Sequence, residues 1–462
     1  MRSHLHFMGI GGISMSGLAR HYRAAGHVVS GCDGQPSATL DELGTLGISA
    51  AIGHDPRHLD GVDVLVTSAA IADDAPERSA AQARGIPVRR RIDLLAEMFG
   101  RYRALGVTGT HGKSTTSGMI ATVLLAESRD PAVQLGATLP ALGGVMRYGE
   151  GPHLVAEVDE SDAGFAQLVA DVAVVTNLED DHIAGDHGER RTYHASLDEL
   201  EAAVVRYARQ ARVLVYCGDW PVLDALLADH PARVRYGEAA DADYRIRELT
   251  LQPAGSRFVL EAPDGERAEV QLRVPGRYNA LNATAALAAT HRVGVPLASA
   301  ASALGSFEGV GRRWQRWGEV GGALIIDDYA HHPTEVRATL EAARATGRRV
   351  RAVLQPHRWV RTARHWRALA DAAALADEVV VLDVYGAGEQ AIPGVSSAHI
   401  VARLHDAGCD ATHLDLPAAT RYLGGSLRPG DLVITLGAGD VWRVAQALIT
   451  PAAVSAGTGG SP

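Results

Sequence analysis

The stretch Gly-Thr-His-Gly-Lys-Ser, which ends at Ser114, has the composition of a loop that binds phosphate. Gly109 and Gly112 would let backbone N–H groups approach a nucleotide closely. Lys113 would supply a cation for the β- and γ-phosphates, and the hydroxyl of Ser114 could ligate Mg²⁺. The strict pattern requires a glycine five positions before the second glycine, where this chain has Val107. A glycine-rich turn that merely starts a helix therefore remains an alternative.

An acidic stretch, Glu-Val-Asp-Glu-Ser-Asp at residues 157–162, follows a predicted strand and could hold a metal ion. Its carboxylates repel one another unless a cation neutralises them, and hard oxygen donors such as Glu157 are what Mg²⁺ prefers. The motif Asn-Leu-Glu-Asp-Asp-His follows the next predicted strand and adds His182 as a further candidate ligand. The alternatives are a solvated acidic turn and a structural histidine.

A second glycine loop follows an apolar run near the N-terminus and reads Gly-Ile-Gly-Gly-Ile-Ser. A dinucleotide fingerprint would have glycine where Ser14 stands, so the match is incomplete. The mechanism still applies, because such a loop brings N–H groups and the positive end of a helix to a diphosphate. Asp33 follows the second predicted strand, where an acidic residue often contacts a ribose. A tight structural turn is the alternative.

Two asparagines, Asn279 and Asn282, lie three residues apart at the start of an apolar helical pattern. If the helix has begun, they share one face, where two carboxamides could contact the edge of a purine. Capping of the helix N-terminus is the alternative.

The motifs DDYAHHP and QPHRWVRT each follow a predicted strand in the last third of the chain. Arg358 and Arg361 of the second motif form a local pair of guanidinium groups suited to a carboxylate or phosphate. His331 and His332 of the first motif could hydrogen-bond a substrate, or could cap a helix that begins at the following proline.

These motifs need strands and helices to position them, and the sequence predicts an α/β fold. Short β-branched runs recur, and each is followed by glycine or polar residues and an alanine-rich helical stretch. This alternation predicts parallel sheets covered on both faces, in which ligands bind beyond the carboxyl ends of strands. The predicted strands are Val62–Thr67, Leu154–Val158, Val172–Thr176, Leu324–Asp328, Arg351–Leu354, Glu378–Asp383 and Asp431–Leu436.

We expect three domains. Residues 1–100 carry the first glycine loop, residues 101–309 carry the Lys113 loop, and residues 310–450 begin with a fresh strand. Alternating residues between about 236 and 275 predict a small antiparallel element within the second domain. The small, polar tail at residues 451–462 is predicted to be disordered.

Composition narrows the function further. The net charge of −10 argues against bulk binding of nucleic acid, and no run of 18 apolar residues predicts a membrane span. The three cysteines form no paired motif, which argues against a disulfide framework and a thiolate zinc site. With no signal peptide at the N-terminus, a cytoplasmic protein is expected.

The order of the motifs resembles that of the Mur ligase family, over nearly the whole chain. The motifs at residues 6–441 are HFMGIGGISMSGLA, GTHGKSTT, AEVDESDAGF, TNLEDDH, PGRYNALNATAALA, GVGRRWQ, DDYAHHPTEV, QPHRWVRT, DVYGAGE and LGAGDV. The resemblance implies a Rossmann-like N-terminal domain for a UDP-linked substrate and a central phosphate-loop domain for ATP. It also implies a Rossmann-like C-terminal domain that closes over the active site. In this family the phosphate loop has the short form seen here.

The resemblance implies an ATP-dependent ligase with Mg²⁺ as cofactor. Its substrates would be ATP, UDP-N-acetylmuramate and, from the GIGG opening and the two C-terminal motifs, L-alanine. An acyl phosphate would form on the lactyl carboxylate, the amine would attack it, and ADP and phosphate would leave. Such a reaction belongs to peptidoglycan precursor synthesis, and so to cell-wall biogenesis, cell shape and cell division. A monomer or weak homodimer is expected.

The resemblance also implies roles for particular residues. The expected catalytic residues are Lys113, Glu157, His182, His331, Arg358 and Arg361, and the expected magnesium ligands are Ser114, Glu157 and His182. The expected ATP-binding residues are Gly109, Thr110, His111, Gly112, Lys113, Ser114, Thr115, Asn279, Asn282, Arg313 and Asp328. The expected UDP-substrate residues are Gly9, Gly11, Gly12, Ile13, Ser14, Asp33, Ser68, Tyr329, His331, Arg358 and Arg361.

The chain departs from the family pattern at a few positions. Tyr278 stands in place of histidine, Ala330 in place of glycine, Ile183-Ala184 in place of Met-Asp, and residues 185–192 are unusually charged. Three alternative functions remain. A sibling ligase that attaches a preformed peptide would share the ATP site, whereas a nicotinamide-dependent oxidoreductase would leave Lys113 unexplained. A non-catalytic nucleotide-binding regulator would not need the polar residues at so many strand ends.

Overall fold

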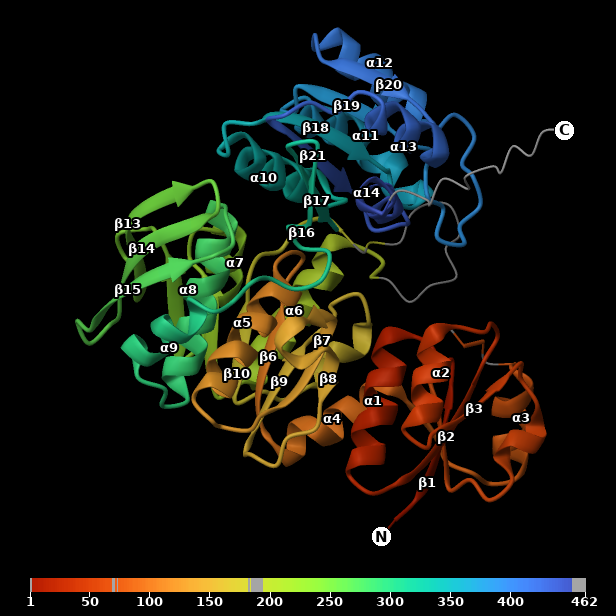
Figure 1. The fold of residues 1–462 in the computed structure, drawn as a ribbon. Helices are drawn as coiled ribbons and strands as arrows, with labels where there is room; N and C mark the ends of the chain where they lie inside the picture. Colours follow the sequence, from red (N-terminus) through yellow and green to blue (C-terminus); the bar gives the residue numbers. More distant parts are fainter. Residues whose placement is uncertain (1, 69–70, 73, 182, 184–193, 451–462) are drawn as a thin grey trace, which may run out of the picture. The chain divides into compact units, whose positions relative to one another are not determined.

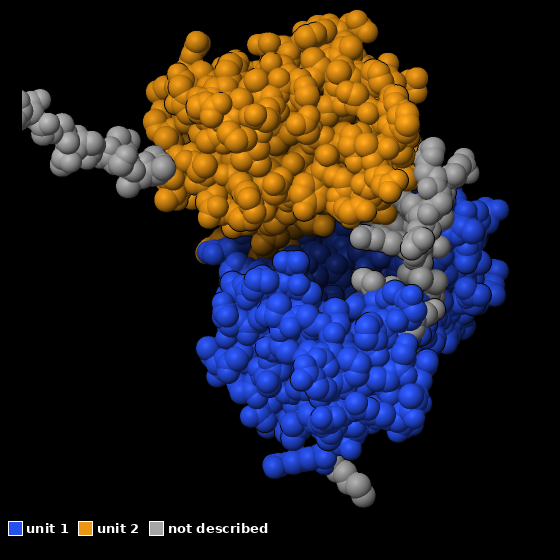
Figure 2. All heavy atoms as spheres, turned by 90° about the vertical axis from the view of Figure 1, so that its right-hand side faces the viewer, with its two compact units in different colours: residues 1–249, 257–272, 279–308 blue, residues 250–256, 273–278, 309–462 orange. Residues whose placement is uncertain are grey.

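The structure is a computed structural model that describes residues 2–68, 71–72, 74–181, 183 and 194–450. Within them the chain forms three β-sheets with flanking helices, which confirms the predicted three-domain α/β fold (Figure 1). By contacts between residues the chain divides into two compact units (Figure 2). The first unit comprises residues 1–249, 257–272 and 279–308, and the second comprises 250–256, 273–278 and 309–462. The domain boundaries given above stay predictions.

The first sheet has five parallel strands in the order β3-β2-β1-β4-β5. Strand order reverses at β1, so the crevice at the carboxyl ends of β1 and β4 is where such sheets bind ligands. The strands are β1 His4–Met8, β2 Val28–Asp33, β3 Ser49–Ile52, β4 Val64–Thr67 and β5 Val88–Arg90. The helices are α1 Ile13–Ala24, η1 Pro56–Leu59, α2 Ala38–Thr45, α3 Pro76–Ala83 and α4 Arg91–Arg101.

The second sheet has ten strands in the order β15-β14-β13-β12-β11-β10-β6-β9-β7-β8. Its strands are β6 Arg103–Thr108, β7 Ala132–Leu139, β8 Gly144–Arg147, β9 His153–Glu157, β10 Val172–Val175, β11 Val213–Cys217, β12 Arg233–Gly237, β13 Tyr244–Gln252, β14 Gly255–Glu261 and β15 Arg267–Leu272. Its helices are α5 Lys113–Ala126, η2 Pro140–Leu142, η3 Ala163–Gln167, α6 Leu197–Gln210, α7 Pro221–Leu227, α8 Arg277–Arg292 and α9 Leu297–Leu304. The predicted small element near residues 236–275 corresponds to β13–β15, which form one end of this sheet.

Strand β6 lies between β10 and β9 and is parallel to both (Figure 1). Its side chains from Ala104 to Thr108 are buried, and α5, which follows it, is buried from Ser114 to Leu124. A helix that is buried around its circumference is fixed by packing on several sides. The loop between β6 and α5 is therefore held at both ends by the core of the sheet.

The third sheet has six strands in the order β16-β17-β21-β18-β19-β20, and only β16 is antiparallel to its neighbour. Its strands are β16 Gln315–Val320, β17 Ala323–Asp328, β18 Arg349–Leu354, β19 Glu378–Val381, β20 Asp410–His413 and β21 Asp431–Leu436. Its helices are α10 Pro333–Arg344, α11 Trp359–Ala373, α12 Ser397–Asp406, α13 Leu416–Gly424 and α14 Trp442–Ile449. Separate apolar clusters pack on its two faces.

All seven predicted strands are present, and their ends differ from the prediction by at most two residues. Helix α5 starts at Lys113, directly after Gly112 of the loop. No helix among the described residues is both long and apolar enough to cross a membrane.

Candidate active site

The two glycines of the loop after β6 have conformations that other residues avoid. Gly109 has φ +127° and Gly112 has φ +83°. A Cβ at Gly109 would lie 2.3 Å from Oγ1 of Thr176, and a Cβ at Gly112 would lie 2.5 Å from Oδ1 of Asn282. Both positions therefore require glycine for conformation as well as for space, which is the requirement of a loop whose backbone closely approaches a ligand.

Residues that follow the neighbouring strand β10 fasten this loop. The backbone N–H of His111 donates to Oδ1 of Asn177 at 2.8 Å, and the hydroxyl of Thr176 donates to the carbonyl oxygen of His111 at 2.6 Å. The N–H of Glu179 donates to Oγ1 of Thr110 at 2.8 Å, and the carboxylate of Glu179 lies 2.9 Å from Nε2 of His111. The loop is thus held in one conformation before any ligand binds.

The ammonium group of Lys113 turns back into this loop. Its Nζ donates to the carbonyl oxygens of Gly109 at 2.7 Å and Thr110 at 3.1 Å, and to the carboxylate of Glu160 at 2.9 Å. Lys113 is the only lysine in the chain, and every other basic residue counted with it is arginine. The three donors of a compact ammonium match these three acceptors, whereas a guanidinium is planar and larger and would not fit among them.

Glu160 is buried and Lys113 is mostly buried, and the acidic neighbours of this pair affect the pKa of both groups. Burial lowers the pKa of Lys113, but the charges of Glu160, Asp159 and Glu157 outweigh that effect and raise it overall. Burial raises the pKa of Glu160 to about 7, against the opposing attraction of Lys113. The negative potential of the acidic stretch therefore converges on the loop, where it favours an ammonium and a bound metal cation alike.

Glu157 ends β9 beside β6, in register with Val107, and its Oε2 accepts the N–H of Gly136 in β7 at 2.8 Å. A Cβ at Gly136 would lie 2.6 Å from the same carboxylate. Ser114, in the first turn of α5, is buried. A hydroxyl and a carboxylate on adjacent elements are hard oxygen donors of the kind that Mg²⁺ accepts.

Asn279 and Asn282 are the third and sixth residues of α8, which begins at Arg277, so neither occupies the N-cap position. The capping alternative is therefore wrong for both. They share one face, as predicted, and their side chains lie 3.5 Å apart. Asn282 accepts the hydroxyl of Thr116 at 3.3 Å and packs against Gly112, so α8 contacts the loop from its far side. A contact of either with adenine stays a prediction.

The first glycine loop, between β1 and α1, has no basic residue, and the carboxylate of Asp33 from the end of β2 contacts it. Gly9 has φ +71°, and its N–H donates to the carbonyl oxygen of Cys32 at 2.8 Å. The N–H of Gly11 donates to Oδ2 of Asp33 at 2.9 Å. The hydroxyl of Ser68, just beyond β4, would lie 4.0 Å from a Cβ at Gly9, so it borders the same loop. Ile13 and Ser14 open α1 there, and Ile13 is exposed.

In the second unit, Asp328 ends β17 and is buried. Its two oxygens accept the N–H groups of Trp314 at 2.8 Å and Ala330 at 2.9 Å. Burial raises the pKa of Asp328 to about 6, against the opposing charge of Arg313. The guanidinium of Arg313 stacks on the ring of Tyr329 at 4.8 Å. These predicted residues therefore form one cluster.

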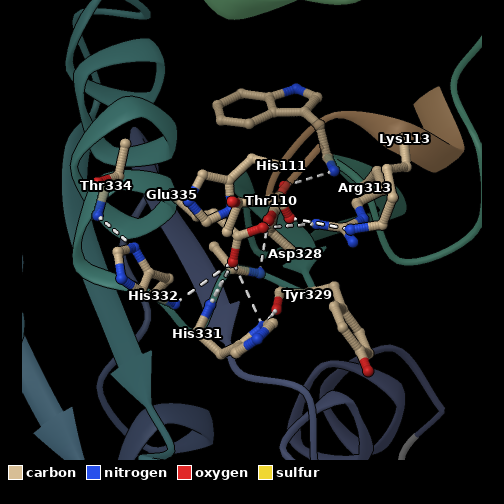
Figure 3. Close-up of polar contacts among 12 residues, drawn as sticks. Thr110, His111, Lys113, Arg313, Asp328, Tyr329, His331, His332, Thr334 and Glu335 are labelled. Carbon is tan, nitrogen blue, oxygen red and sulfur yellow. Dashed lines mark hydrogen bonds and ion pairs between the residues drawn. The ribbon is translucent and has the colours of Figure 1, made fainter. Parts of the chain in front are cut away.

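The two histidines after β17, His331 and His332, form different hydrogen bonds (Figure 3). His332 is the N-cap of α10, where its ring accepts the N–H of Thr334 at 3.4 Å, so the capping alternative is right for this residue. The Nδ1 of His331 instead donates to the carbonyl oxygen of Tyr329 at 2.9 Å. Glu335 accepts the N–H of His331 at 3.1 Å and fixes the turn.

Arg358 and Arg361 each contact a residue of their own unit, and joint binding of a carboxylate or phosphate by the two guanidinium groups stays a prediction. Arg358 is buried and pairs with the carboxylate of Glu389, whereas Arg361 donates to Nδ1 of His357 at 3.2 Å. Arg358 has φ +70°, which is rare for a residue with a side chain and is found mostly at functional sites. The ring of His357 lies 5.7 Å from that of His331, so the two motifs are adjacent.

The structure thus gathers the predicted residues into three clusters: the first glycine loop, the Lys113 loop and the end of β17. His182, Ala184 and the charged stretch at 185–192 lie outside the described residues. Sequence reasoning missed Thr176, Asn177, Glu179 and Glu160, although their place after β10 and β9, the neighbours of β6, was a usable signal.

Three family profiles match consecutive parts of the chain. They are the Mur ligase family catalytic domain at residues 4–103, the Mur ligase middle domain at 107–290 and the Mur ligase glutamate ligase domain at 312–439.

Several characterised proteins are similar over nearly their full length. The UDP-N-acetylmuramate–L-alanine ligase of Deinococcus radiodurans is 44% identical over 96% of this chain and 93% of that protein. The enzyme of the same name from Acidothermus cellulolyticus is 42% identical over 94% of this chain and 91% of that protein. Among solved structures, the UDP-N-acetylmuramate-alanine ligase of Thermotoga maritima superposes with a TM-score of 0.81 at 29% identity, covering 97% of this chain and 98% of that one.

Proposed function

The chain belongs to the Mur ligase family, and from this premise we propose that it joins L-alanine to the lactyl carboxylate of UDP-N-acetylmuramate at the expense of ATP. The reaction is a cytoplasmic step of peptidoglycan precursor synthesis. The observation that carries the proposal is the Lys113 loop, in which the only lysine of the chain directly follows the second of two obligatory glycines, Gly109 and Gly112. The full-length likeness to proteins named for this reaction supplies the substrates.

The Lys113 loop fits a magnesium nucleotide. Gly109 and Gly112 leave the backbone bare, so its N–H groups and the N-terminus of α5 can face a triphosphate. Ser114 and Glu157 would hold Mg²⁺, with His182 as a further predicted ligand. When bound, the ion would neutralise charge on the phosphates and orient them. Asn279, Asn282, Arg313 and Asp328 would contact the remainder of ATP.

The chemistry needs a better electrophile than a carboxylate, whose charge is delocalised over two oxygens. Transfer of the γ-phosphoryl group to the lactyl carboxylate makes an acyl phosphate and ADP. The neutral amine of L-alanine then attacks the carbonyl carbon, and inorganic phosphate leaves. The protein forms no bond to the substrates, so it acts by positioning and by neutralising charge. Lys113 would supply the cation for the transferred group.

The other two clusters would hold the sugar substrate and the amine. The first glycine loop, with Asp33 and Ser68 beside it, lies at the switch point of its sheet and would bind the UDP portion. Tyr329, His331, Arg358 and Arg361 would line the pocket for the muramoyl group and L-alanine. The positive φ of Arg358 supports a functional role, because such strain is kept where the side chain must be placed.

Release of inorganic phosphate tests the proposal directly. The purified protein is mixed with ATP, Mg²⁺ and UDP-N-acetylmuramate, and L-alanine, glycine, L-serine and a tripeptide are added in separate reactions. We expect L-alanine to give the highest kcat/KM, with a product whose mass equals that of the sugar nucleotide plus one alanyl residue. Stimulation by the tripeptide alone would instead identify a peptide-attaching ligase, and absence of phosphate release with every amine would refute the proposal.

A further inference from the structure

The first unit contains a buried group of metal-binding side chains outside the sites described above. His6 on β1, Cys32 on β2, His58 on η1 and Glu77 on α3 each offer one ligand atom, and these atoms lie within 4.8 Å of one another. Four different elements thus converge on one point on a face of the first sheet.

The cluster lies within the apolar core of this domain. Glu77 and Cys32 are 0% exposed and His6 is 2% exposed, and Cys32 belongs to an apolar cluster that includes Leu59 and Leu65. Oε1 of Glu77 lies 2.7 Å from Nδ1 of His58, 3.2 Å from Sγ of Cys32 and 3.8 Å from Nε2 of His6. A carboxylate in such surroundings is costly unless a cation or several donors compensate for it.

A relay of hydrogen bonds determines which ring nitrogen of a neutral His6 carries the proton. Nδ1 of His4 lies 3.0 Å from the carbonyl oxygen of Gly61, an acceptor, so this nitrogen must carry the proton. Nε2 of a neutral His4 therefore accepts the hydroxyl proton of Ser30 at 2.8 Å. The oxygen of Ser30 then accepts Nδ1–H of His6, also at 2.8 Å.

This relay leaves the lone pair of a neutral His6 on Nε2, and Nε2 is buried with no hydrogen-bond partner among the described residues. That lone pair faces the negative carboxylate of Glu77 at 3.8 Å. Two electron-rich groups in a dry site repel each other unless a cation lies between them. A histidine whose second nitrogen is fixed by an outer hydrogen bond is also the usual arrangement of a metal ligand.

We propose that this cluster binds one divalent transition-metal ion of the zinc type, with Nε2 of His6, Sγ of Cys32, Nδ1 of His58 and the carboxylate of Glu77 as ligands. Zinc bonds of about 2.0–2.3 Å place tetrahedral donors roughly 3.5 Å apart. The observed separations from Glu77, 2.7–3.8 Å, bracket that value, so small side-chain movements complete the site.

The charges of the proposed site balance. Binding replaces the thiol proton of Cys32, which leaves to solvent, with a bond from sulfur to the metal. One thiolate, one carboxylate and two neutral imidazoles then cancel the two positive charges of the ion, as a buried site requires. His54, whose Nδ1 lies 2.9 Å from Oε2 of Glu77, would hold the far oxygen of that carboxylate.

The proposed site is independent of the proposed ligase activity, and it differs from what the sequence argument expects. The absence of paired cysteines argued against a thiolate zinc site, but this cluster needs only Cys32 together with residues from three other elements.

Cobalt substitution of the full-length protein tests the proposal. The protein is stripped with a chelator and titrated with Co²⁺, which gives a thiolate-to-metal charge-transfer band and the intense visible bands of tetrahedral coordination. We expect saturation at one ion per chain, competition by one equivalent of Zn²⁺, and a higher unfolding temperature with either metal. Cys32→Ser should lose the charge-transfer band, and His58→Asn, at a partly exposed position, should weaken binding at least tenfold.

Cys217→Ser is the matched control, because Cys217 is also a buried cysteine of the first unit but lies at the end of β11. It should keep the full spectrum. The far-ultraviolet circular dichroism of each variant checks that it has folded. Absence of the bands in the folded wild-type protein, or an unchanged charge-transfer band in Cys32→Ser, would overturn the proposal.

Discussion

The two glycine loops of this chain start from the same local plan and end with opposite charge. Both follow a central parallel strand and precede a helix, after β1 in one sheet and after β6 in another. The loop after β6 contains the ammonium of Lys113, held by Glu160. The loop after β1 contains no basic residue, and the carboxylate of Asp33 accepts the N–H of Gly11.

The difference teaches that glycines fix the path of such a loop, whereas its charge can come from the residue that follows it, as with Lys113, or from a neighbouring strand, as with Asp33. Asp33 comes from the end of β2, and Asn177 comes from just beyond β10. A loop that contains a cation suits the transfer of a phosphoryl group. A loop that is contacted by a carboxylate from a neighbouring strand suits the binding of a nucleotide that is not transformed, through ribose and backbone contacts.

Among the predicted effects, replacement of Lys113 should change activity the most, and it should affect the function of the loop after β6 without affecting that of the loop after β1. Lys113→Ala should reduce kcat by at least about a thousandfold, because it removes the cation that neutralises the transferred group. Binding of UDP-N-acetylmuramate, measured by calorimetry, should change less than about twofold, since the other loop holds it. Lys113→Arg is the matched control for charge.

We expect Lys113→Arg to be nearly as inactive as Lys113→Ala, because a guanidinium cannot occupy the pocket made by Gly109, Thr110 and Glu160. Near-normal turnover in the arginine variant would show that charge alone matters there. A comparable loss of sugar-nucleotide binding would contradict the assignment of ATP to the loop after β6 and of the sugar nucleotide to the loop after β1.

Two glycine substitutions, one in each loop, test whether the loop after β6 is more tightly constrained in conformation than the loop after β1. Gly112→Ala forces φ +83° on a residue with a side chain and places its Cβ 2.5 Å from Asn282. We expect it to lower kcat/KM for ATP roughly a hundredfold and the unfolding free energy by about 2 kcal/mol. Gly12→Ala has φ −66° and a nearest contact of 3.4 Å, so its unfolding free energy should change by less than about 0.5 kcal/mol.

Those stabilities can be measured by urea unfolding of the two variants. Equal losses in both would mean that the loop after β6 is not specially constrained.

Replacement of Asp33 tests the carboxylate of the first loop. Asp33→Ala removes the acceptor of the Gly11 N–H and the predicted ribose contact. We expect KM for UDP-N-acetylmuramate to rise about tenfold while KM for ATP and kcat stay within about twofold, because a charge-assisted hydrogen bond is worth about 1.5–3 kcal/mol. Steady-state kinetics with each substrate varied in turn measures this. A rise in KM for ATP of the same size would contradict the assignment.

Acidification should destabilise α1, which follows the first loop, more than α5, which follows the second. This effect is expected to be smaller than those of the substitutions. Burial, assisted by the charge of Arg101, lowers the pKa of His21 in α1 to about 4. The unfolded chain therefore binds the proton more tightly, so this stability is complete above about pH 6.5 and is lost as pH falls towards 4. At about pH 5.5 the loss should be about 1 kcal/mol.

In α5 the buried polar side chains Ser114 to Ser117 are hydroxyls that do not titrate in this range. Glu160, which contacts Lys113 at the start of α5, has a pKa raised by burial to about 7, so its protonation stabilises the folded state as pH falls and acts in the opposite direction to His21. Amide hydrogen exchange is measured above about pH 6.5 and at about pH 5.5, and each rate is corrected for the intrinsic exchange rate at that pH. At the lower pH, α1 should lose protection relative to α5. His21→Leu should abolish the loss in α1. Equal loss in both helices of the wild-type protein would contradict the prediction.

The sequence was informative wherever neighbouring residues determine the structure. Gly109 and Gly112 beside Lys113 specify a loop between a strand and a helix, because φ, space and charge are all local properties there. His332 could be predicted as a cap because the proline that follows it starts a helix. The fold class followed from the alternation of strands and helices for the same reason.

The sequence was less informative where a contact joins distant segments. Glu160 lies 47 positions after Lys113, and its role depends on which way its side chain points beyond β9. Arg358 pairs with Glu389, which lies 31 positions later, and the spacing of the two arginines gives no sign of this contact. Such partners follow from strand order and side-chain direction, which spacing alone does not specify.

One measurement tests the central claim most directly, because the chain has a single lysine. Protein labelled with ¹³C and ¹⁵N in lysine gives one side-chain ammonium signal by NMR, and that signal belongs to Lys113. The account predicts that a non-hydrolysable ATP analogue with Mg²⁺ shifts this signal strongly, whereas UDP-N-acetylmuramate alone leaves it almost unchanged. A signal that stays in place while calorimetry shows the analogue to be bound would contradict the account.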